Sequence, residues 1–471
     1  MEVKELYDLV CEKAKTFGME AKNSKDNTNT IVNPNGNAII RNSTISEKAV
    51  QDGKAYFGFI GPEEETSGQY SDFSFVIFPE RELGACVVAL GVGSNKFKND
   101  YQLALQPGLR RNFLKLRGDR TFFKTSFVDV ESSSSVLLKE VRKNFSALSK
   151  VIMDFRTVLP AAVIVDDVEN KLEVIYQWLA MYAKMRGWAT NDTQRGEIED
   201  TLKDILNSQT QPNEQEEIQQ LLNTRKYVVL QGAPGTGKTW NALEIAKQYD
   251  ETFFEQFHAE TTYSDFVYGL EPNCAAKAGE SQFQPKKGVL YLAVKYALDN
   301  PKKKVLLIID EINRANLSNV LGPVFFLFEY QANNRKGSLK LGDLEPVASL
   351  PDNLHVIATM NTADRSLAVV DFALRRRFAW YTLRPHIISV PKFDNDTFNA
   401  FADIFYKYAT DEELNLQPGQ SYFTDKKNMK DRMIYELMPL IKEYLAEGYL
   451  LNAKDEFCAL FLEKTDKMMY E

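Results

Sequence analysis

Apolar residues in the second half of the chain gather in short continuous runs, separated by polar and glycine-rich segments. Such runs cover 228–230, 253–258, 305–309 and 354–360. Central strands of a parallel sheet are buried on both faces, so they carry continuous apolar runs rather than alternation. We therefore predict a parallel sheet with flanking helices, in which the run at 305–309 forms a central strand. The run at 253–258 predicts a short strand that is also buried.

The first half of the chain has a different pattern of apolar and polar residues. Apolar residues at helical spacing predict one helix over residues 2–18 and another over 172–185. The asparagine-rich stretch 23–42 predicts loops and turns, because it contains a Pro-Asn-Gly sequence. Glycine and proline interrupt the apolar β-type runs that follow. We predict a small α+β domain with strands at 55–60, 73–78 and 85–90.

Length, charge and composition narrow the class of protein. The chain has 471 residues, too many for one ordinary domain, and its polar segment 207–217 predicts an interdomain linker. The net charge of −8 excludes a uniformly basic nucleic-acid binder, although a local basic surface is still compatible. Four scattered cysteines and only three histidines argue against a zinc site. A charged N-terminus without a long apolar run favours a cytoplasmic protein with no membrane segment.

One basic segment, residues 96–124, is a candidate nucleic-acid surface. Its eight lysines and arginines outnumber two aspartates, and aromatic residues are interleaved among them. Cations that hold phosphates beside aromatics that meet bases are typical of DNA-contacting surfaces. A solvated charged face over ordinary core aromatics has the same composition, and the sequence alone favours this second interpretation.

Residues 228–239 read VVLQGAPGTGKT, an apolar run that leads through a glycine-rich turn into a helix-like segment. The spacing is that of a phosphate loop. Glycines let backbone N–H groups converge on phosphate oxygens, and the following helix N-terminus favours negative charge. We expect Lys238 to reach the β- and γ-phosphates and the Thr239 hydroxyl to bind Mg²⁺. The predicted nucleotide-binding residues are Gly232, Ala233, Pro234, Gly235, Thr236, Gly237, Lys238 and Thr239.

Two acidic residues close the predicted central strand. Asp310 is expected to hold Mg²⁺ through water, beside the Thr239 hydroxyl, and Glu311 to activate the attacking water as a general base. Asn361 ends the next strand-like run, where its amide can orient the same water. After a phosphate loop, this order predicts hydrolysis of a nucleoside triphosphate.

An arginine run follows these residues in the sequence. The guanidinium groups of Arg375 and Arg376 can neutralise the charge that develops on a transferred phosphoryl group. An arginine supplied by a neighbouring subunit would couple hydrolysis to assembly. A surface basic cluster is the alternative, and the order of the motifs favours the catalytic role.

This ordered set resembles an AAA+ module, and its details are similar to the McrB family, the GTP-dependent motor subunits of modified-cytosine restriction systems. The resemblance covers about residues 226–449, roughly half the chain. Its most specific segment is 360–366 (MNTADRS), which implies that Asp364 positions the catalytic water together with Asn361. Further similar segments are 256–258, 263–270, 309–316, 371–378 and 438–445.

The resemblance implies an α/β fold class: an AAA+ P-loop module, with a parallel sheet, flanking helices and a small helical lid, preceded by a separate α+β N-terminal domain. It implies a homo-oligomeric ring, expected to be a hexamer, that uses Mg²⁺ with GTP or ATP as substrate. A separate McrC-like nuclease subunit is the implied partner, and the N-terminal domain is expected to bind DNA. The predicted boundaries are 1–205 for the N-terminal recognition domain, 206–217 for the linker, 218–385 for the AAA+ core and 386–471 for the lid.

The chain departs from the family pattern at three places. Pro323 stands where an acidic residue is expected, and segment 419–423 (GQSYF) only approximates the family's glycine-histidine-serine segment. That leaves Arg432 as the candidate contact from the lid to the nucleotide. The first half contains no recognisable modified-base domain. The guanine motif of small GTPases is also missing from the sequence, so GTP and ATP both remain open.

Three functions fit these observations. The first is the NTPase motor of an McrBC-like restriction or phage-defence complex, which couples hydrolysis to DNA translocation. The second is an AAA+ ATPase of the MoxR or dynein-related kind, which remodels a protein client. The third is a scaffold that uses nucleotide as a switch. Segment 360–366 favours the first.

Overall fold

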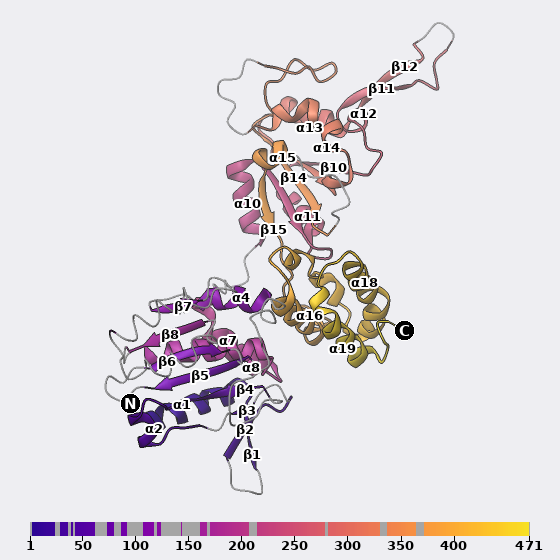
Figure 1. The fold of residues 1–471 in the computed structure, drawn as a ribbon. Helices are drawn as coiled ribbons and strands as arrows, with labels where there is room; N and C mark the ends of the chain where they lie inside the picture. Colours follow the sequence, from indigo (N-terminus) through magenta and orange to yellow (C-terminus); the bar gives the residue numbers. More distant parts are fainter. Residues whose placement is uncertain are drawn as a thin grey trace. The chain divides into compact units, whose positions relative to one another are not determined.

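The fold was obtained as a computed structural model (Figure 1). The chain divides into two compact units: Met1–Thr210 with Asp403–Thr410, and Gln211–Ala402 with Asp411–Glu471. We call them the first and the second unit. The structure describes residues 2–23, 29–35, 39–40, 43–61, 73–79, 86–91, 107–116, 120–123, 143, 161–166, 170–206, 214–277, 281–329, 337–363 and 372–470.

An antiparallel sheet forms the centre of the first unit, in the strand order β1-β2-β3-β4-β5-β6-β8-β7. Helices α1 (Val3–Thr16) and α7 (Lys171–Arg186) contribute apolar faces to its core. The strands are β1 (Glu20–Asn23), β2 (Asn29–Val32), β3 (Ile39–Ile40), β4 (Phe57–Ile60), β5 (Ser74–Pro79), β6 (Cys86–Gly91), β7 (Thr121–Phe123) and β8 (Ala161–Val165). The remaining helices are α2 (Glu47–Gln51), α4 (Pro107–Phe113), α8 (Asp192–Thr201) and α9 (Lys203–Leu206).

The predicted elements of this unit are largely confirmed. Both predicted helices and the three strands at 55–60, 73–78 and 85–90 are present, as α1, α7, β4, β5 and β6. The prediction of loops and turns over 23–42 is wrong for residues 29–32 and 39–40, where β2 and β3 lie, although a turn is present at residues 34–35. Strand β2 pairs with β1, and the side chains of Ile31 and Ile40 are buried in the core. Cross-strand pairing and burial thus override the low strand propensity of asparagine.

The basic segment lies only partly within the described residues. Arg111 donates hydrogen bonds to the carbonyls of Ala409 and Tyr406, at 2.7 and 2.9 Å, within the first unit. Arg120 forms an ion pair with Asp166. These two guanidinium groups therefore have partners inside the protein. At these two positions the structure favours the second interpretation over a DNA-contacting surface.

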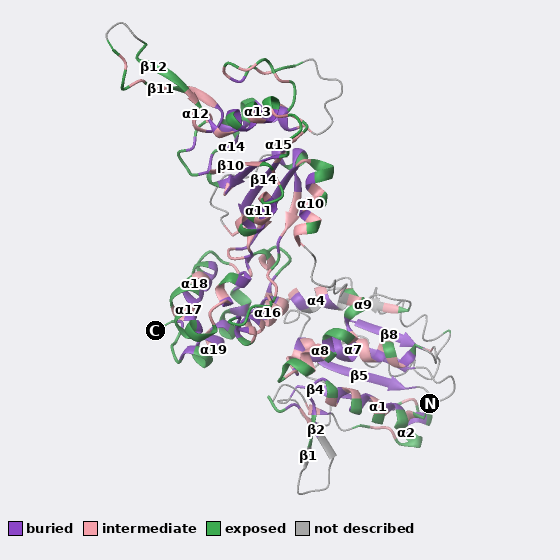
Figure 2. Cartoon of the chain, turned by 180° about the vertical axis from the view of Figure 1, so that it is seen from behind, coloured by how far each residue is buried: buried purple, intermediate pink, exposed green. Residues whose placement is uncertain are grey.

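A five-stranded parallel sheet forms the centre of the second unit, in the order β10-β13-β14-β9-β15. Its strands are β9 (Tyr227–Gly232), β10 (Glu251–Gln256), β13 (Val305–Asp310), β14 (Leu354–Asn361) and β15 (Ala379–Thr382). Helices α10 (Glu214–Arg225) and α11 (Lys238–Ala246) pack on one face, and α13 (Val289–Asp299) contributes to the core of the other. The predicted α/β fold class is confirmed. All six residues of β13 are buried, as expected of a central strand (Figure 2).

Strand β10 corrects one prediction. Residues 253–258 were expected to form a buried strand, but β10 is an edge strand and Phe254 is 45% exposed. An apolar run alone does not distinguish a central strand from an edge strand, because position in the sheet is set by crossover connections elsewhere in the chain.

Smaller elements surround the sheet of the second unit. A two-stranded antiparallel hairpin consists of β11 (Tyr268–Pro272) and β12 (Phe283–Lys287). Short helices α12 (Tyr263–Phe266), α14 (Leu317–Val320) and α15 (Phe372–Arg377) connect the strands. The C-terminal region is helical, with α16 (Asn395–Tyr408), α17 (Met429–Arg432), α18 (Met438–Ala446) and α19 (Lys454–Thr465). In the part of the chain that the structure describes, no helix is long and apolar enough to cross a membrane.

Candidate nucleotide-binding site

The glycine-rich turn connects the end of β9 directly to the start of α11. Gly235 and Gly237 have φ angles of +79° and +83°, in the left-handed region that glycine adopts without strain. Gly237 is the N-cap of α11, so the free N–H groups of the first helical turn face the loop. The turn therefore has the backbone geometry of an anion-binding loop.

The Lys238 ammonium group lies inside the loop. Its Nζ donates to the carbonyls of Gly232 and Ala233, at 3.0 and 2.9 Å, and only 8% of the residue is exposed. The Thr236 hydroxyl donates to the same Ala233 carbonyl, at 2.9 Å. Phosphate oxygens would be stronger acceptors for the ammonium than these carbonyls. The loop thus holds a cation where a β- or γ-phosphate can be bound.

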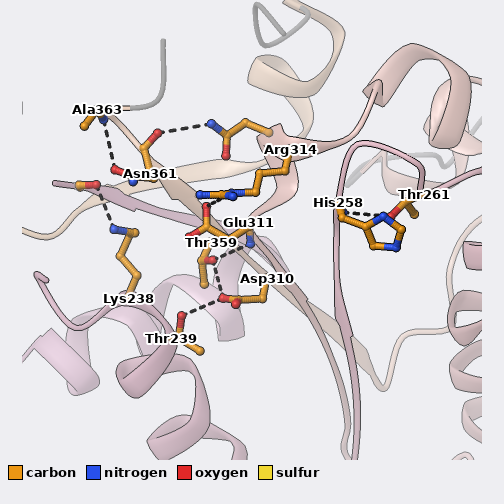
Figure 3. Close-up of polar contacts among 12 residues, drawn as sticks. Lys238, Thr239, His258, Thr261, Asp310, Glu311, Arg314, Thr359, Asn361 and Ala363 are labelled. Atoms are coloured by element: carbon orange, nitrogen blue, oxygen red, sulfur yellow. Dashed lines mark hydrogen bonds and ion pairs between the residues drawn. The ribbon is translucent and has the colours of Figure 1, made fainter. Parts of the chain in front are cut away.

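Thr239 and Asp310 meet at the carboxyl edge of the sheet (Figure 3). The Thr239 hydroxyl donates to Asp310 Oδ1, at 2.8 Å, and Asp310 is 6% exposed. A hydroxyl and a carboxylate are the hard oxygen ligands that Mg²⁺ prefers, and Mg²⁺ usually takes its other ligands from phosphate and water. Among the described residues no cluster of three His, Cys, Asp or Glu side chains could hold a metal alone. This pair therefore fits a nucleotide-bound Mg²⁺.

Glu311 follows Asp310 in an unusual backbone conformation. Its φ and ψ are +53° and +49°, in the left-handed region, which costs about 1 kcal/mol for a residue with a Cβ. Its N–H donates to the Thr359 hydroxyl at 3.0 Å, and its carboxylate lies 3.6 Å from Arg314 Nε. Backbone strain of this kind is common at functional sites. Glu311 directly follows Asp310 at this edge of the sheet, and a carboxylate at this position can accept a proton.

Asn361 ends β14 beside the phosphate loop, in register with Gly232 on β9. Its side-chain oxygen accepts a hydrogen bond from the Ala363 N–H at 3.1 Å, and its backbone carbonyl accepts one from Asn313 at 3.3 Å. The structure therefore places Asn361 at the same sheet edge as Lys238. The predicted catalytic residue Asp364 lies outside the described residues.

Arg375 and Arg376 do not join this site. Both belong to α15, which directly precedes β15. Because β15 runs parallel to β9, with Ala379 in register with Val228, its amino end lies at the edge opposite the phosphate loop. The chain's own phosphate loop is therefore out of reach of both arginines.

The three neighbouring arginines differ in their surroundings. Arg377 is 8% exposed, and its Nη2 lies 2.7 Å from Glu329 Oε1. The Arg376 side chain is 70% exposed and lies farther from the same carboxylate, at 3.7 Å. The Arg375 guanidinium stacks on the Trp380 ring at 5.3 Å, and the Trp380 indole N–H donates to the Arg375 carbonyl. Arg377 is thus structural, whereas Arg376 can reach a second molecule.

This difference predicts opposite results for two matched variants. Arg377→Ala removes the nearer and more buried of the two arginines beside the Glu329 carboxylate, so it should lower the free energy of unfolding by about 3 kcal/mol. Arg376→Ala should change unfolding by less than about 0.5 kcal/mol, since surface ion pairs contribute little. Denaturant unfolding of the full chain measures both. Equal stabilities of the two variants would contradict the assignment.

The lid approaches the phosphate loop through segment 419–421. Gly419 N–H donates to the Pro234 carbonyl at 2.9 Å, and Ser421 N–H to the Gly235 carbonyl at 3.0 Å. The Gln420 side-chain amide donates to the Thr236 carbonyl at 3.0 Å. These contacts were not predicted, because only the fold brings the two segments together, although the glycine at 419 was a signal of close backbone approach.

Arg432 does not point freely toward the loop. Its guanidinium donates to the Ser421 carbonyl at 3.0 Å and pairs with Glu436 at 2.9 Å. It therefore fastens segment 419–421, rather than offering an uncommitted charge to a nucleotide.

Comparisons with known proteins agree with this geometry. Residues 227–378 match the family model of the AAA domain, dynein-related subfamily. The chain is 28% identical over 424 residues to the EcoKMcrB subunit of the type IV methyl-directed restriction enzyme of Escherichia coli K12, covering 83% of this chain and 85% of that protein. It is also 28% identical over 193 residues to YdiS, a component of the type II restriction enzyme BsuMI of Bacillus subtilis 168, covering 32% of this chain and 55% of that protein.

The extent of the first match changes one prediction. Motifs in the sequence limited the resemblance to about half the chain, whereas the match covers 83% of it. This is more than the second unit contains, so the similarity extends into the first unit. The similarity to the EcoKMcrB subunit thus extends over both units, and the nucleotide site described above lies within the residues that match the AAA domain.

Proposed function

We propose that this McrB-like chain, whose residues 227–378 form a dynein-related AAA+ module, is the NTP-hydrolysing subunit of a DNA restriction complex. The observation that carries the proposal is the convergence of Lys238, Thr239, Asp310 and Asn361 at one edge of the parallel sheet. In the proposed complex, hydrolysis of GTP or ATP drives DNA translocation and a separate McrC-like subunit cuts the DNA.

The residues divide the chemistry among them. Mg²⁺, when bound with the nucleotide, neutralises phosphate charge. Thr239 and Asp310 would hold it through their side-chain oxygens, and Lys238 would exchange its two loop carbonyls for phosphate oxygens. Glu311 accepts a proton from the attacking water, which Asn361 and Asp364 orient. All of these residues except Asp364 lie at the carboxyl edge of the sheet. The role of Asp364 is supported by the family resemblance alone.

The placement of the arginines favours a ring. Because Arg375 and Arg376 lie at the opposite edge of the sheet, they serve catalysis only by reaching the site of a neighbouring subunit. A closed homo-oligomer, proposed to be a hexamer, brings each α15 to the next nucleotide. The turnover rate then depends on protein concentration. Arg376→Ala lowers the turnover rate without lowering the free energy of unfolding.

The restriction role rests on the two relatives, both of which are components of restriction enzymes. The family description, AAA domain of the dynein-related subfamily, favours the second candidate, an ATPase that remodels a protein client. Under the first candidate the first unit binds DNA, and under the second it binds a protein.

The experiment that separates these candidates is phosphate release by the full chain with GTP and with ATP, with and without double-stranded DNA. We expect DNA to raise the rate several-fold, and the stimulation to weaken as salt rises, because phosphate contacts release counterions. The comparison is a ratio, so slow basal turnover without the nuclease subunit does not affect it. ATP preference without stimulation by DNA would contradict the restriction role and favour a protein client.

A further inference from the structure

The Thr359 hydroxyl lies between the two acidic residues of the candidate site (Figure 3). It donates to Asp310 Oδ1 at 2.7 Å and accepts the Glu311 backbone N–H at 3.0 Å. Thr359 has no exposed surface. A valine has the same shape and would suit a buried strand better, since a buried hydroxyl is costly unless its hydrogen bonds are made. The hydroxyl at this position therefore needs a reason beyond packing.

Its two hydrogen bonds act on different features of the site. Thr239 on α11 and Thr359 on β14 both donate a hydrogen bond to the same oxygen, Asp310 Oδ1, so two hydroxyls hold that oxygen in place. Among the described residues none hydrogen-bonds Oδ2, which is left for a cation or its water. The bond to the Glu311 N–H holds that residue in its left-handed conformation, which sets the direction in which the carboxylate leaves the backbone.

Thr359 also connects the acidic residues to Asn361. The two residues are two positions apart on β14, so their side chains lie on the same face of the sheet. A second tie runs from Asn313, three residues beyond Asp310, to the Asn361 carbonyl at 3.3 Å. Strand β14 therefore positions the proposed metal ligand, general base and water-orienting amide through adjacent hydrogen bonds.

We propose that Thr359 is a positioning residue for nucleotide hydrolysis, which orients Asp310 and Glu311 through its hydroxyl without touching the nucleotide. This inference rests on the proposed NTP hydrolysis. Since it acts through the two acidic residues, its loss affects the rate of the chemical step and the response to Mg²⁺. Nucleotide affinity depends chiefly on the phosphate loop, so the loss of the Thr359 hydroxyl leaves it nearly unchanged.

The test compares Thr359→Val and Thr359→Ala, which lack the hydroxyl, with Thr359→Ser, which keeps it. In the full chain we expect kcat of the first two to fall about 10- to 100-fold, as is typical when a catalytic group is misplaced. KM and the Kd of a fluorescent nucleotide analogue should stay within about threefold, and half-maximal rate should require more Mg²⁺. Thr359→Ser should retain kcat within about threefold. Thr252→Val, on edge strand β10, is the matched control and should behave as wild type.

Several outcomes would overturn the inference. One is a folded Thr359→Val or Thr359→Ala protein that hydrolyses nucleotide at the wild-type rate, and another is a Thr359→Ser protein as slow as these variants. If Thr359→Val and Thr359→Ala both fail to fold, Thr359 stabilises the core rather than positioning the acidic residues. If the wild-type chain itself hydrolyses neither GTP nor ATP, the proposed function fails first, so the two failures are distinguishable.

Discussion

Lys238→Ala is expected to abolish nucleotide binding. The ammonium group is the one cation that the structure places inside the phosphate loop among the described residues, held 3.0 and 2.9 Å from two loop carbonyls. Without it the β- and γ-phosphates lose a charge-assisted hydrogen bond in a largely buried place. We expect affinity for GTP and ATP to fall at least about 100-fold, equivalent to about 2.7 kcal/mol. Titration with a fluorescent nucleotide analogue measures this loss.

A matched control for this variant is Lys247→Ala. Lys247 follows the same helix α11, but its side chain is 69% exposed and pairs with Glu244 on the surface. Its removal should leave nucleotide affinity unchanged. Retained affinity in Lys238→Ala would remove the phosphate-loop assignment, and equal losses in both variants would indicate a general effect of positive charge.

Glu311→Gln is expected to separate binding from hydrolysis. Glutamine has nearly the same shape and keeps the backbone N–H that Thr359 accepts, but its amide cannot take a proton from water. We expect kcat to fall about 100- to 1000-fold while the nucleotide Kd stays within about threefold. In the proposed ring, bound triphosphate would then persist between subunits, so the assembly should also be more stable, which size measurement of the nucleotide-bound protein can show.

Glu271→Gln is a suitable control for the loss of a carboxylate. Glu271 lies on the β11–β12 hairpin, where it accepts a hydrogen bond from Gln284 at 2.8 Å, and it takes no part in the nucleotide site. Its turnover should match wild type. A Glu311→Gln protein that hydrolyses at the wild-type rate would exclude Glu311 as the general base.

Local sequence was sufficient where the chemistry itself is local. The spacing of glycines with Lys238 and Thr239 fixes a turn and the start of a helix within a few residues, so the local geometry of this loop could be predicted. The apolar run before Asp310 likewise predicted a central strand, because burial on both faces leaves no polar positions. These features need no information from distant parts of the chain.

Features that depend on distant segments could not be predicted in the same way. Thr359 matters through its register against Asp310 and Glu311, which the pairing of β13 with β14 determines. Segment 419–421 reaches the phosphate loop only through the fold of the lid. The hydrophobic pattern also could not show that β10 lies at an edge, because strand order depends on the crossover connections.

The arginines illustrate a third kind of limit. Their order in the sequence predicted a catalytic role, yet the parallel pairing of β15 with β9 puts them at the far edge of their own sheet. In the proposed ring they reach the nucleotide of a neighbouring subunit, and it is the strand pairing, not their order in the sequence, that takes their own site out of reach. Burial then distinguishes them, since Arg377 is committed to Glu329 and Arg376 is exposed.

The central claim is that residues 232–239 with Asp310 and Glu311 form a Mg²⁺-dependent NTPase site. Its most direct test is steady-state phosphate release from GTP and from ATP by the wild-type chain, in Mg²⁺ and in EDTA, beside Lys238→Ala and Glu311→Gln. We predict release from at least one nucleotide in Mg²⁺, and its loss in EDTA and in both variants. Wild-type release no greater than that of Lys238→Ala with either nucleotide would contradict the claim.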